Sequence, residues 1–533
     1  MNSNPSDEST CYRLAQHFYA NNQINLAKDT LISITKNANC TYESLYFLGN
    51  LYLESGNLLE AIDIFGTALQ KSQTYEANFQ IGFAFIQMND FKKAIHFFNN
   101  ALKILPDGIE ALINIGAAYR SIGECKKSVE YFDSALKIAP NEASLWLNRG
   151  VALAAMGQFE DAIFNYSEAI RIKKNYLEAY SNKGNAEIAL GLFSAAHQSF
   201  QAALRISPGD VDTISNYSVL KLAEGNFTEG WQDYEARFEC QEKIFNPFSS
   251  IPRLNRLQHI ENKRILVWAE QGLGDSIQFY RYLHELEKYA NNITFVVQDE
   301  LIELFKNQKL KIIIVGFGEV KKSDHDLQCP LMSLPLLFKT DKSSIPSVTP
   351  YITSDIHKKA YWSDTLSKYS GLKVGLTWSG GYKKDPNLWA MNERRNIPFS
   401  NFYRLLNLHT INYFCLQKGH GLESTEYLDK ALFCSADNFH DYSEQLHTFS
   451  DTAAFIDNLD LVISVDTSVA HLTGALGKPI WIINRFDSCW RWLINKTDSP
   501  WYSTAKIYNQ CQPNEWATVI KAIEKDLVAL SKH

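Results

Sequence analysis

Between residues 8 and 240 the chain repeats a pattern of apolar and small residues with a period of 34 residues. Two columns of this pattern are glycine, one at Gly82, Gly116, Gly150 and Gly184 and the other at Gly123, Gly157, Gly191 and Gly225. Two more are alanine, one at Ala27, Ala61, Ala94, Ala162 and Ala196 and the other at Ala68, Ala101, Ala135, Ala169 and Ala203. Self-similarity at a fixed period of this length predicts a repeat architecture, in which each unit packs on its neighbours.

The period and the columns resemble the tetratricopeptide repeat, in which two antiparallel helices pack through small residues. In such a repeat, glycine or alanine lets the backbones approach, and bulky residues such as Trp146 and Phe200 fill the remaining space. The spacing gives about seven units between residues 8 and 240. The first and last units depart from the pattern, with Ala15 and Ser218 in the glycine column, as expected for capping units. We therefore expect an α-helical superhelix of tetratricopeptide repeats.

A polar column runs through the same array, two residues before the first glycine column. Its members are Gln80, Asn114, Asn148, Asn182 and Asn216. A carboxamide offers one acceptor and two donors, so it can pair with both the N–H and the C=O of an extended peptide. The column therefore predicts a peptide-binding track on the concave face, and the repeat array of protein O-GlcNAc transferases carries a similar asparagine ladder. The alternative is that a polar, solvated helix face simply tolerates asparagine.

The pattern changes after residue 240. Residues 241–260 are rich in turn formers and predict a linker. Short apolar runs, at 264–269, 293–297 and 311–315, then alternate with segments of helical periodicity, which predicts a parallel sheet in a first α/β lobe over residues 261–370. Further apolar runs, at 373–377, 413–416, 461–465 and 480–484, predict a second α/β lobe over residues 371–533. Two such lobes leave a cleft between them, with polar strand-end residues facing it.

One strand–turn–helix in the second lobe is suited to bind an anion. The apolar run 461–465 is followed by Asp466, Thr467 and Ser468, and then by an alanine-rich helical stretch that ends near Gly477. A turn at the carboxyl end of a strand is where open α/β sheets bind ligands, and helix N-termini bind phosphate. The alternative is an ordinary connection between strand and helix. The turn at 270–276 lacks the third glycine of the dinucleotide fingerprint, so we do not expect an NAD site.

Composition narrows the class of function. A net charge of −7 and a pI near 6.0 give no general attraction to nucleic acid or to anionic membranes. No apolar run approaches the roughly 18 residues of a spanning helix, and residues 1–10 lack the apolar core of a signal peptide. The nine cysteines contain no C-x-x-C pair, so we expect free thiols in a reducing compartment and no zinc site. These features predict a cytoplasmic protein of about three to four structural units.

Several residue strings carry a resemblance beyond architecture. They are Ala-Glu-Gln-Gly-Leu-Gly-Asp at 269–275, Cys-Pro-Leu-Met-Ser-Leu-Pro at 329–335, Leu-Gln-Lys-Gly at 416–419, Val-Asp-Thr-Ser-Val-Ala-His-Leu at 465–472 and Trp-Arg-Trp at 490–492. In this order they resemble bacterial tetratricopeptide proteins with a heptosyltransferase-like glycosyltransferase domain, and the resemblance covers nearly the whole chain. It implies a GT-B fold of two Rossmann-like lobes, and inverting sugar transfer from a nucleotide sugar without a metal or other cofactor.

The resemblance also implies roles for residues. Asp275 of the first lobe corresponds to the catalytic base, with capping of the following helix as the alternative. The turn of Asp466, Thr467, Ser468 and His471 corresponds to the site of the donor diphosphate. Further donor-binding candidates are Gly272, Gly274, Trp378, Arg395, Gln417, Lys418 and Arg491. A core role for Trp378, a packing role for His471 and solvated salt bridges for the cations are the alternatives. The chain departs from the family at Cys489, where relatives usually carry an acidic residue.

Three functional hypotheses follow. The first is a glycosyltransferase whose acceptor is a protein or peptide bound by the repeats. The second is a glycosyltransferase acting on a saccharide or lipid-linked acceptor, with the repeats docking a partner. The third is a non-catalytic scaffold whose transferase domain has decayed. The intact Asp275, Lys418, Asp466 and His471 favour the first two hypotheses, and the asparagine column favours the first over the second. A nucleic-acid role is disfavoured by the charge.

Overall fold

The computed structural model of the chain describes residues 8–35, 40–240, 244–381, 394–418 and 436–532. It divides into two compact units, one up to Lys183 and one from Gly184 onward, and the division falls within a helix. Each unit is described by itself below. None of the helices in the described ranges is both long and apolar enough to cross a membrane.

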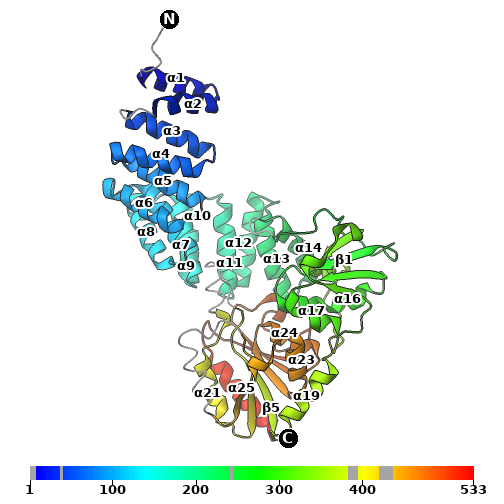
Figure 1. Cartoon of the computed structure of the whole chain (residues 1–533). Coiled ribbons are helices and arrows are strands. Elements are labelled where there is room, and N and C mark those ends of the chain that lie inside the picture. The colour runs from blue at the N-terminus through cyan, green and yellow to red at the C-terminus, as the bar shows by residue number, and fades with distance from the viewer. Residues whose placement is uncertain (1–7, 36–39, 241–243, 382–393, 419–435, 533) are drawn as a thin grey trace. The chain divides into compact units, whose positions relative to one another are not determined.

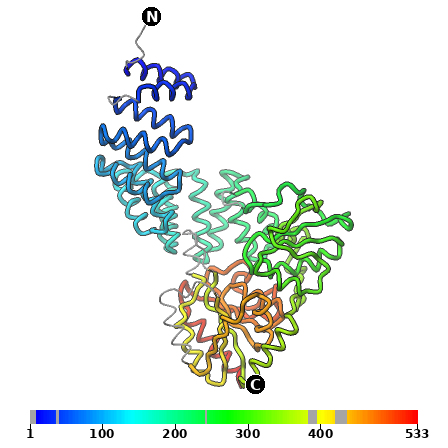
Figure 2. Tube along the Cα trace, in the orientation of Figure 1, coloured from blue at the N-terminus to red at the C-terminus, as the bar shows by residue number. Residues whose placement is uncertain are grey.

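The first part of the chain is a helical repeat array. The described residues up to 234 form fourteen α-helices: α1 (Glu8–Ala20), α2 (Ile24–Thr35), α3 (Tyr42–Glu54), α4 (Leu58–Lys71), α5 (Tyr75–Gln87), α6 (Phe91–Ile104), α7 (Ile109–Ser121), α8 (Cys125–Ile138), α9 (Ala143–Ala155), α10 (Phe159–Ile172), α11 (Leu177–Ala189), α12 (Phe193–Ile206), α13 (Val211–Glu224) and α14 (Phe227–Tyr234). Within the first unit, α1 to α10 stack in chain order, each against the next (Figure 1, Figure 2).

The first glycine column sets the distance between the two helices of a repeat. At Gly82 of α5, a Cβ atom would lie 2.7 Å from the Phe98 ring of α6, and at Gly116 of α7 it would lie 2.9 Å from the Phe132 ring of α8. Only a residue without a side chain leaves room for the aromatic ring that stands 16 residues later. The bulky column and the small column of the sequence are therefore the two sides of one contact.

The second glycine column ends the first helix of each pair. Gly123 and Gly157 have positive φ angles of 82° and 75°, in the left-handed region that reverses the chain after a helix. Asn89 occupies the equivalent place with a φ of 58°. Asparagine tolerates this conformation better than most side chains, which explains why it replaces glycine there.

The second unit contains two parallel sheets. The first has the strand order β3-β2-β1-β4 and the second has the order β10-β9-β8-β5-β6-β7. The strands are β1 (Arg264–Trp268), β2 (Asn292–Val296), β3 (Ile313–Val315), β4 (Leu327–Pro330), β5 (Leu372–Thr377), β6 (Ile411–Cys415), β7 (Phe439–Asp441), β8 (Leu461–Val465), β9 (Ile480–Asn484) and β10 (Ala505–Asn509). Every printed strand pairing is parallel.

Helices connect and cover these strands, as parallel pairing requires. They are α15 (Leu273–Phe279), α16 (Arg281–Leu286), α17 (Asp299–Lys306), α18 (Leu334–Leu337), α19 (Ile356–Leu366), α21 (Tyr403–Leu406), α23 (Phe449–Asp457), α24 (Ser468–Ala475) and α25 (Ala517–Leu530). The predicted fold class, a helical array followed by an α/β region, is confirmed. The predicted domain boundaries at residues 240, 260 and 370 remain predictions.

The strand orders indicate where a ligand would bind. Sequential order reverses between β1 and β4 in the first sheet and between β5 and β8 in the second. At such switch points the connections leave in opposite directions, and a crevice opens at the carboxyl ends of the strands. The glycine-rich turn after β1 and the Asp466 turn after β8 both lie at these places.

The glycine–ring contact predicts a large asymmetry between two glycines of the array. Gly82→Ala should destabilise the chain by about 1–3 kcal/mol, because the new methyl group overlaps the Phe98 ring. Gly66→Ala in α4 should be neutral or stabilise by up to about 1 kcal/mol, because nothing lies within 4 Å of its Cβ position and alanine favours the helix. Urea unfolding followed by circular dichroism checks both variants. Equal effects of the two would contradict the proposed contact.

Candidate functional site

A cavity of about 1700 Å³ lies in the second unit, at the carboxyl ends of strands from both sheets. The first sheet contributes the turn of residues 270–275 after β1 and part of α17. The second sheet contributes the residues after β5, β6 and β9, and the first turn of α24. The cavity therefore occupies the crevice that the strand orders indicate.

The two sheets approach each other most closely where α15 meets α24. A Cβ atom at Gly274 would lie 2.8 Å from Cδ2 of His471 and 3.5 Å from the Cα of Ser468. Gly274 therefore has no room for a side chain, because the His471 ring fills that space. This contact sets the glycine-rich turn of one lobe directly against the helix start of the other.

Asp275 follows this contact and has both oxygens engaged. Its Oδ2 accepts a hydrogen bond from the Gly272 N–H at 3.0 Å, and its Oδ1 forms an ion pair with the Arg491 guanidinium. The Asp275 side chain is 15% exposed and lines the cavity. The capping alternative and a place in the cavity are both correct, because one oxygen caps α15 and the other reaches Arg491.

Arg491 is buried and faces several negative groups. Burial acts to lower the pKa of its guanidinium, but the carboxylate of Asp275 outweighs burial and raises that pKa well above its usual range. Its Nη1 also donates to Sγ of Cys489 at 3.1 Å. Burial raises the pKa of the Cys489 thiol, which keeps that side chain neutral beside the arginine. The departure from the family at Cys489 thus leaves Asp275 as the ion-pair partner of Arg491.

Asp466 is fixed by three aromatic neighbours of the second lobe. Its Oδ1 accepts from Nε1 of Trp492 at 2.8 Å and lies 3.7 Å from Nε2 of His471. The His471 ring stacks on Trp492 and its Nδ1 lies 2.9 Å from the hydroxyl of Tyr502. Burial acts to raise the pKa of Asp466, but the hydrogen bond and charge of His471 and the charge of Arg491 hold it well below its usual range.

The first turn of α24 presents backbone N–H groups to the cavity. Thr467 is the N-cap residue, and its Oγ1 accepts from the Ala470 N–H at 3.4 Å and lies 2.9 Å from the Ser464 hydroxyl. The other N–H groups of a first turn have no acceptor within their own helix. Thr467, Ser468 and Val469 all line the cavity. The turn therefore has the geometry of an anion site.

Cations line the cavity on the side of the second sheet. Lys418 follows β6, and burial lowers the pKa of its ammonium group against the opposing charge of Asp451. Arg395 lies flat against Gly380 and donates to the Gly381 carbonyl at 2.7 Å. Burial lowers the pKa of Arg395 as well, opposed by Asp466. A cation held in a partly desolvated wall attracts an anion more strongly than one in water.

Most of the predicted site residues meet in this one cavity. Those that line it are Gly272, Gly274, Asp275, Arg395, Gln417, Lys418, Asp466, Thr467, Ser468, His471 and Arg491. Gln417 lines it with its amide already committed, because its Oε1 accepts from the backbone N–H groups of Trp378 and Ser379 at 3.2 and 3.0 Å. The Gln417 side chain therefore orders the turn after β5.

Trp378 is a correction to the sequence prediction. It does not line the cavity: its indole is 1% exposed and stacks on Phe399, with the ring centroids 4.0 Å apart. Residue 378 directly follows β5, and its side chain points into the core of the second lobe. The core alternative is the correct one, and only the backbone of Trp378 contributes to the turn.

Two charged residues of the cavity wall were not predicted. Arg485 directly follows β9 and forms an ion pair with Asp487 at 3.3 Å. Glu270 directly precedes the glycine turn, and its side chain is fully buried. Both stand at carboxyl ends of strands, so the rule that selected Lys418 could also have selected them.

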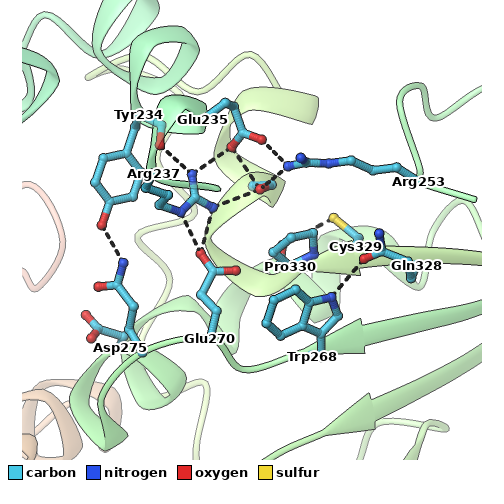
Figure 3. A network of polar contacts seen from close by, with 12 residues as sticks. Tyr234, Glu235, Arg237, Arg253, Trp268, Glu270, Asp275, Gln328, Cys329 and Pro330 are labelled. Carbon is cyan, nitrogen blue, oxygen red and sulfur yellow. Dashed lines mark hydrogen bonds and ion pairs between the residues drawn. The ribbon is translucent and has the colours of Figure 1, made fainter. Parts of the chain in front are cut away.

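Glu270 belongs to a buried polar network that links the end of the helical region to the first sheet (Figure 3). Arg237 lies in the 3-10 turn after α14 and donates to Oε1 of Glu270 through Nε at 3.0 Å and Nη2 at 2.6 Å. It also donates to the Tyr234 carbonyl and to Glu235. Burial raises the pKa of Glu270 to about 7, opposed by the charge of Arg237.

The polar column of the array lies on the first helix of each repeat. Gln80, Asn114, Asn148, Asn182 and Asn216 belong to α5, α7, α9, α11 and α13 respectively, and all five are partly buried. In Asn114, Nδ2 donates to the Glu110 carbonyl of the same helix at 2.7 Å. Asn216 belongs to the second unit and the other four to the first. Their role as a peptide track remains a prediction.

Within the described ranges, the structure contains no group of three or more His, Cys, Asp or Glu side chains able to hold a metal ion.

Comparison with protein families finds tetratricopeptide repeats in the helical region. Residues 42–70, 75–107, 109–142, 143–176 and 177–210 each match such a repeat. A curated relative is Protein FlbA of Caulobacter vibrioides (strain ATCC 19089 / CIP 103742 / CB 15), which is 25% identical over 306 residues. That match covers 52% of this chain and 50% of FlbA, so the chain spans about half the length of this relative.

Solved structures resemble the chain over part of its length. A tetratricopeptide repeat protein from Parabacteroides merdae ATCC 43184 is 16% identical, covers 45% of this chain and 94% of its own, and has a TM-score of 0.39. YrrB, described as a tetratricopeptide protein with an unusual peptide-binding site, is 20% identical, with coverages of 33% and 91% and a TM-score of 0.31. The family matches establish tetratricopeptide repeats within residues 42–210.

The buried Glu270 predicts a pH dependence of stability. A carboxyl whose pKa is raised on folding, here to about 7 from 4.5, stabilises the fold fully below the unfolded value and loses that contribution as the pH rises through 7. The wild-type melting temperature should therefore fall more between pH 5 and pH 8 than that of Glu270→Gln, which cannot ionise. Parallel pH profiles for wild type and variant would contradict this account.

Proposed function

We propose that the chain is a glycosyltransferase that moves a sugar from a nucleotide-sugar donor to an acceptor presented by the tetratricopeptide repeats. One arrangement carries this proposal. A carboxylate from the first lobe, Asp275, faces the same cavity as a helix N-terminus and several cations from the second lobe. Transfer from a nucleotide sugar needs a proton acceptor on one side and stabilisation of a leaving diphosphate on the other.

The second lobe supplies the proposed donor site. A nucleoside diphosphate carries at least two negative charges, and Lys418, Arg395 and Arg485 line the cavity with positive ones. The N–H groups at the start of α24 add donors that are already oriented. Asp466 does not fit a direct phosphate contact, because a carboxylate held in its charged form repels phosphate. Its contacts with Trp492 and His471 support a role in orienting the α24 turn.

The proposed step is a single displacement. The acceptor hydroxyl oxygen forms a bond to the anomeric carbon of the sugar, while the bond from that carbon to the diphosphate oxygen breaks. The hydroxyl proton passes to the Asp275 carboxylate, and the electron pair of the broken bond leaves on the diphosphate. Attack opposite the leaving group inverts the anomeric centre. Arg491 holds Asp275 in place through Oδ1, so the acceptor must approach the carboxylate beside that ion pair.

The acceptor is proposed to be a protein or peptide. Tetratricopeptide repeats are found within residues 42–210, and such repeats form extended protein-binding surfaces. The column of Gln80, Asn114, Asn148, Asn182 and Asn216 offers carboxamides at a repeating distance along that surface. A saccharide or lipid-linked acceptor, with the repeats docking a partner, remains the alternative for this half of the proposal.

One observation favours the rival function of a non-catalytic scaffold. Both Asp275 oxygens already accept, one from Arg491 and one from Gly272. A carboxylate engaged in this way is a weaker proton acceptor than a free one. Activity is therefore expected only if the acceptor hydroxyl shares an oxygen with one of these two donors, and variants of Asp275 decide between the two functions.

The catalytic half of the proposal is tested with Asp275→Asn, which keeps the shape and removes the proton acceptor. Sugar transfer should fall by at least about 100-fold, because general-base catalysis contributes 10²–10⁴-fold. Lys418→Ala should weaken donor affinity by about ten-fold, through loss of one charge-assisted contact. Lys496→Ala, on an exposed loop outside the cavity, serves as the control. Wild-type turnover in Asp275→Asn, with an unchanged melting temperature, would overturn the assignment.

The acceptor half is tested with the double variant Asn148→Ala and Asn182→Ala. If the carboxamides pair with a peptide backbone, acceptor affinity should fall about ten-fold, since each lost hydrogen bond is worth about 1 kcal/mol. Hydrolysis of the donor by water should stay at the wild-type rate. Asn100→Ala, on the second helix of its repeat, is the matched control. Unchanged acceptor affinity in the double variant would favour the saccharide alternative.

A further inference from the structure

The last helix of the repeat array reaches the catalytic cavity. Trp231 of α14 is 2% exposed and packs edge-to-face on Trp490, with ring centroids 5.4 Å apart, and on Phe279 of α15 at 6.0 Å. Trp490 belongs to the loop after β9, and Phe279 belongs to the helix that starts at the glycine turn. One indole therefore contacts elements of both lobes.

Tyr234, one turn later in α14, contacts the glycine turn itself. Its hydroxyl accepts a hydrogen bond from Nε2 of Gln271 at 2.7 Å, and its ring lies edge-on to Trp490 at 6.2 Å (Figure 3). The Gln271 carbonyl in turn accepts from Nε2 of Gln298 at 2.7 Å. Gln271 is thus held from two sides, four residues before Asp275.

The same helix also supports the partner of Asp275. The Arg491 guanidinium lies over the Trp490 ring, 4.3 Å from its centroid, and forms the ion pair with Asp275. The backbone N–H of Ile494, in the same loop, donates to the Ala223 carbonyl of α13 at 2.9 Å. Ring contacts from α14 and a backbone bond from α13 therefore hold the loop that carries Arg491.

We propose that Trp231 and Tyr234 are positioning residues for sugar transfer, which hold the Gln271 turn and the Trp490–Arg491 loop so that Asp275 points into the cavity. This inference rests on the proposed transferase function. The last repeat is then a working part of the catalytic unit, in agreement with the division of the chain, which places everything from Gly184 onward in one compact unit. A displacement of about 1 Å at a reacting group can cost about 100-fold in rate.

The test uses the full chain with Tyr234→Phe, which keeps the ring and removes the acceptor for Gln271. The value of kcat should fall about ten-fold or more, while KM for the donor stays within about two-fold, because the donor contacts lie on the second lobe. Gln271→Leu should show the same loss. The double variant should be no worse than either single variant, since both remove one hydrogen bond. Tyr131→Phe, which removes a hydrogen bond to Asn99 in the repeats, is the control and should keep wild-type kcat.

A wild-type kcat in Tyr234→Phe would overturn the inference, and so would a loss shared equally by donor affinity and melting temperature, which indicates a purely structural contact. If the wild-type chain transfers sugar from no donor, the proposed function fails, and amide hydrogen exchange still decides the positioning claim. Exchange in residues 270–276 and 489–494 should then be faster in Tyr234→Phe than in wild type and in Tyr131→Phe. Equal exchange in all three proteins would overturn it.

Discussion

The contact between Gly274 and His471 is the constraint on which the rest of the site depends. Because a Cβ at Gly274 would lie 2.8 Å from the histidine ring, the glycine turn of one lobe and the α24 start of the other can approach only with glycine at this position. That approach brings Asp275 within reach of Arg491. It also places the Asp275 carboxylate and the N–H groups of α24 around one cavity.

Charge is distributed unevenly around this contact. Arg491 lies among Asp275, Cys489 and Asp466, and their summed field keeps its guanidinium charged despite burial. The cations that are not satisfied in this way, Lys418 and Arg395, have their pKa values lowered by burial. A cation that pays a desolvation cost without a close anion gains most from binding one. This difference separates the part of the site that orients Asp275 from the part proposed to bind the donor.

Much of the fold could be predicted from the sequence because local patterns and packing agree. The period of 34 residues follows directly from the glycine–ring contact, and the buried strands β1, β5 and β8 are visible as short apolar runs before turns. The short edge strand β7 and the strand β10 were not predicted. β7 has only three residues, and the alternation in β10 is short, so neither gives a distinct periodic signal.

The candidate site could be predicted residue by residue only where a side chain follows a strand and has room to face the crevice. Trp378 follows β5 but turns into the core, since Phe399 offers it a stacking surface there, and a sequence does not contain that contact. Gln417 faces the cavity but uses its carbonyl oxygen on the backbone. The link from α14 to Trp490 joins residues far apart in the chain, so no local pattern could reveal it.

The central claim is that the cavity binds a nucleotide sugar, and a thermal-shift panel of nucleoside diphosphates and their sugars tests it most directly. A ligand that binds only the folded chain stabilises it by about 2.7 kcal/mol at 100 times its dissociation constant. The account predicts that at least one diphosphate raises the melting temperature of the wild type, and that the shift shrinks when Lys418 and Arg485 are both replaced by alanine. A panel in which no nucleotide shifts the wild type, or in which the double variant shifts as much, would contradict the account.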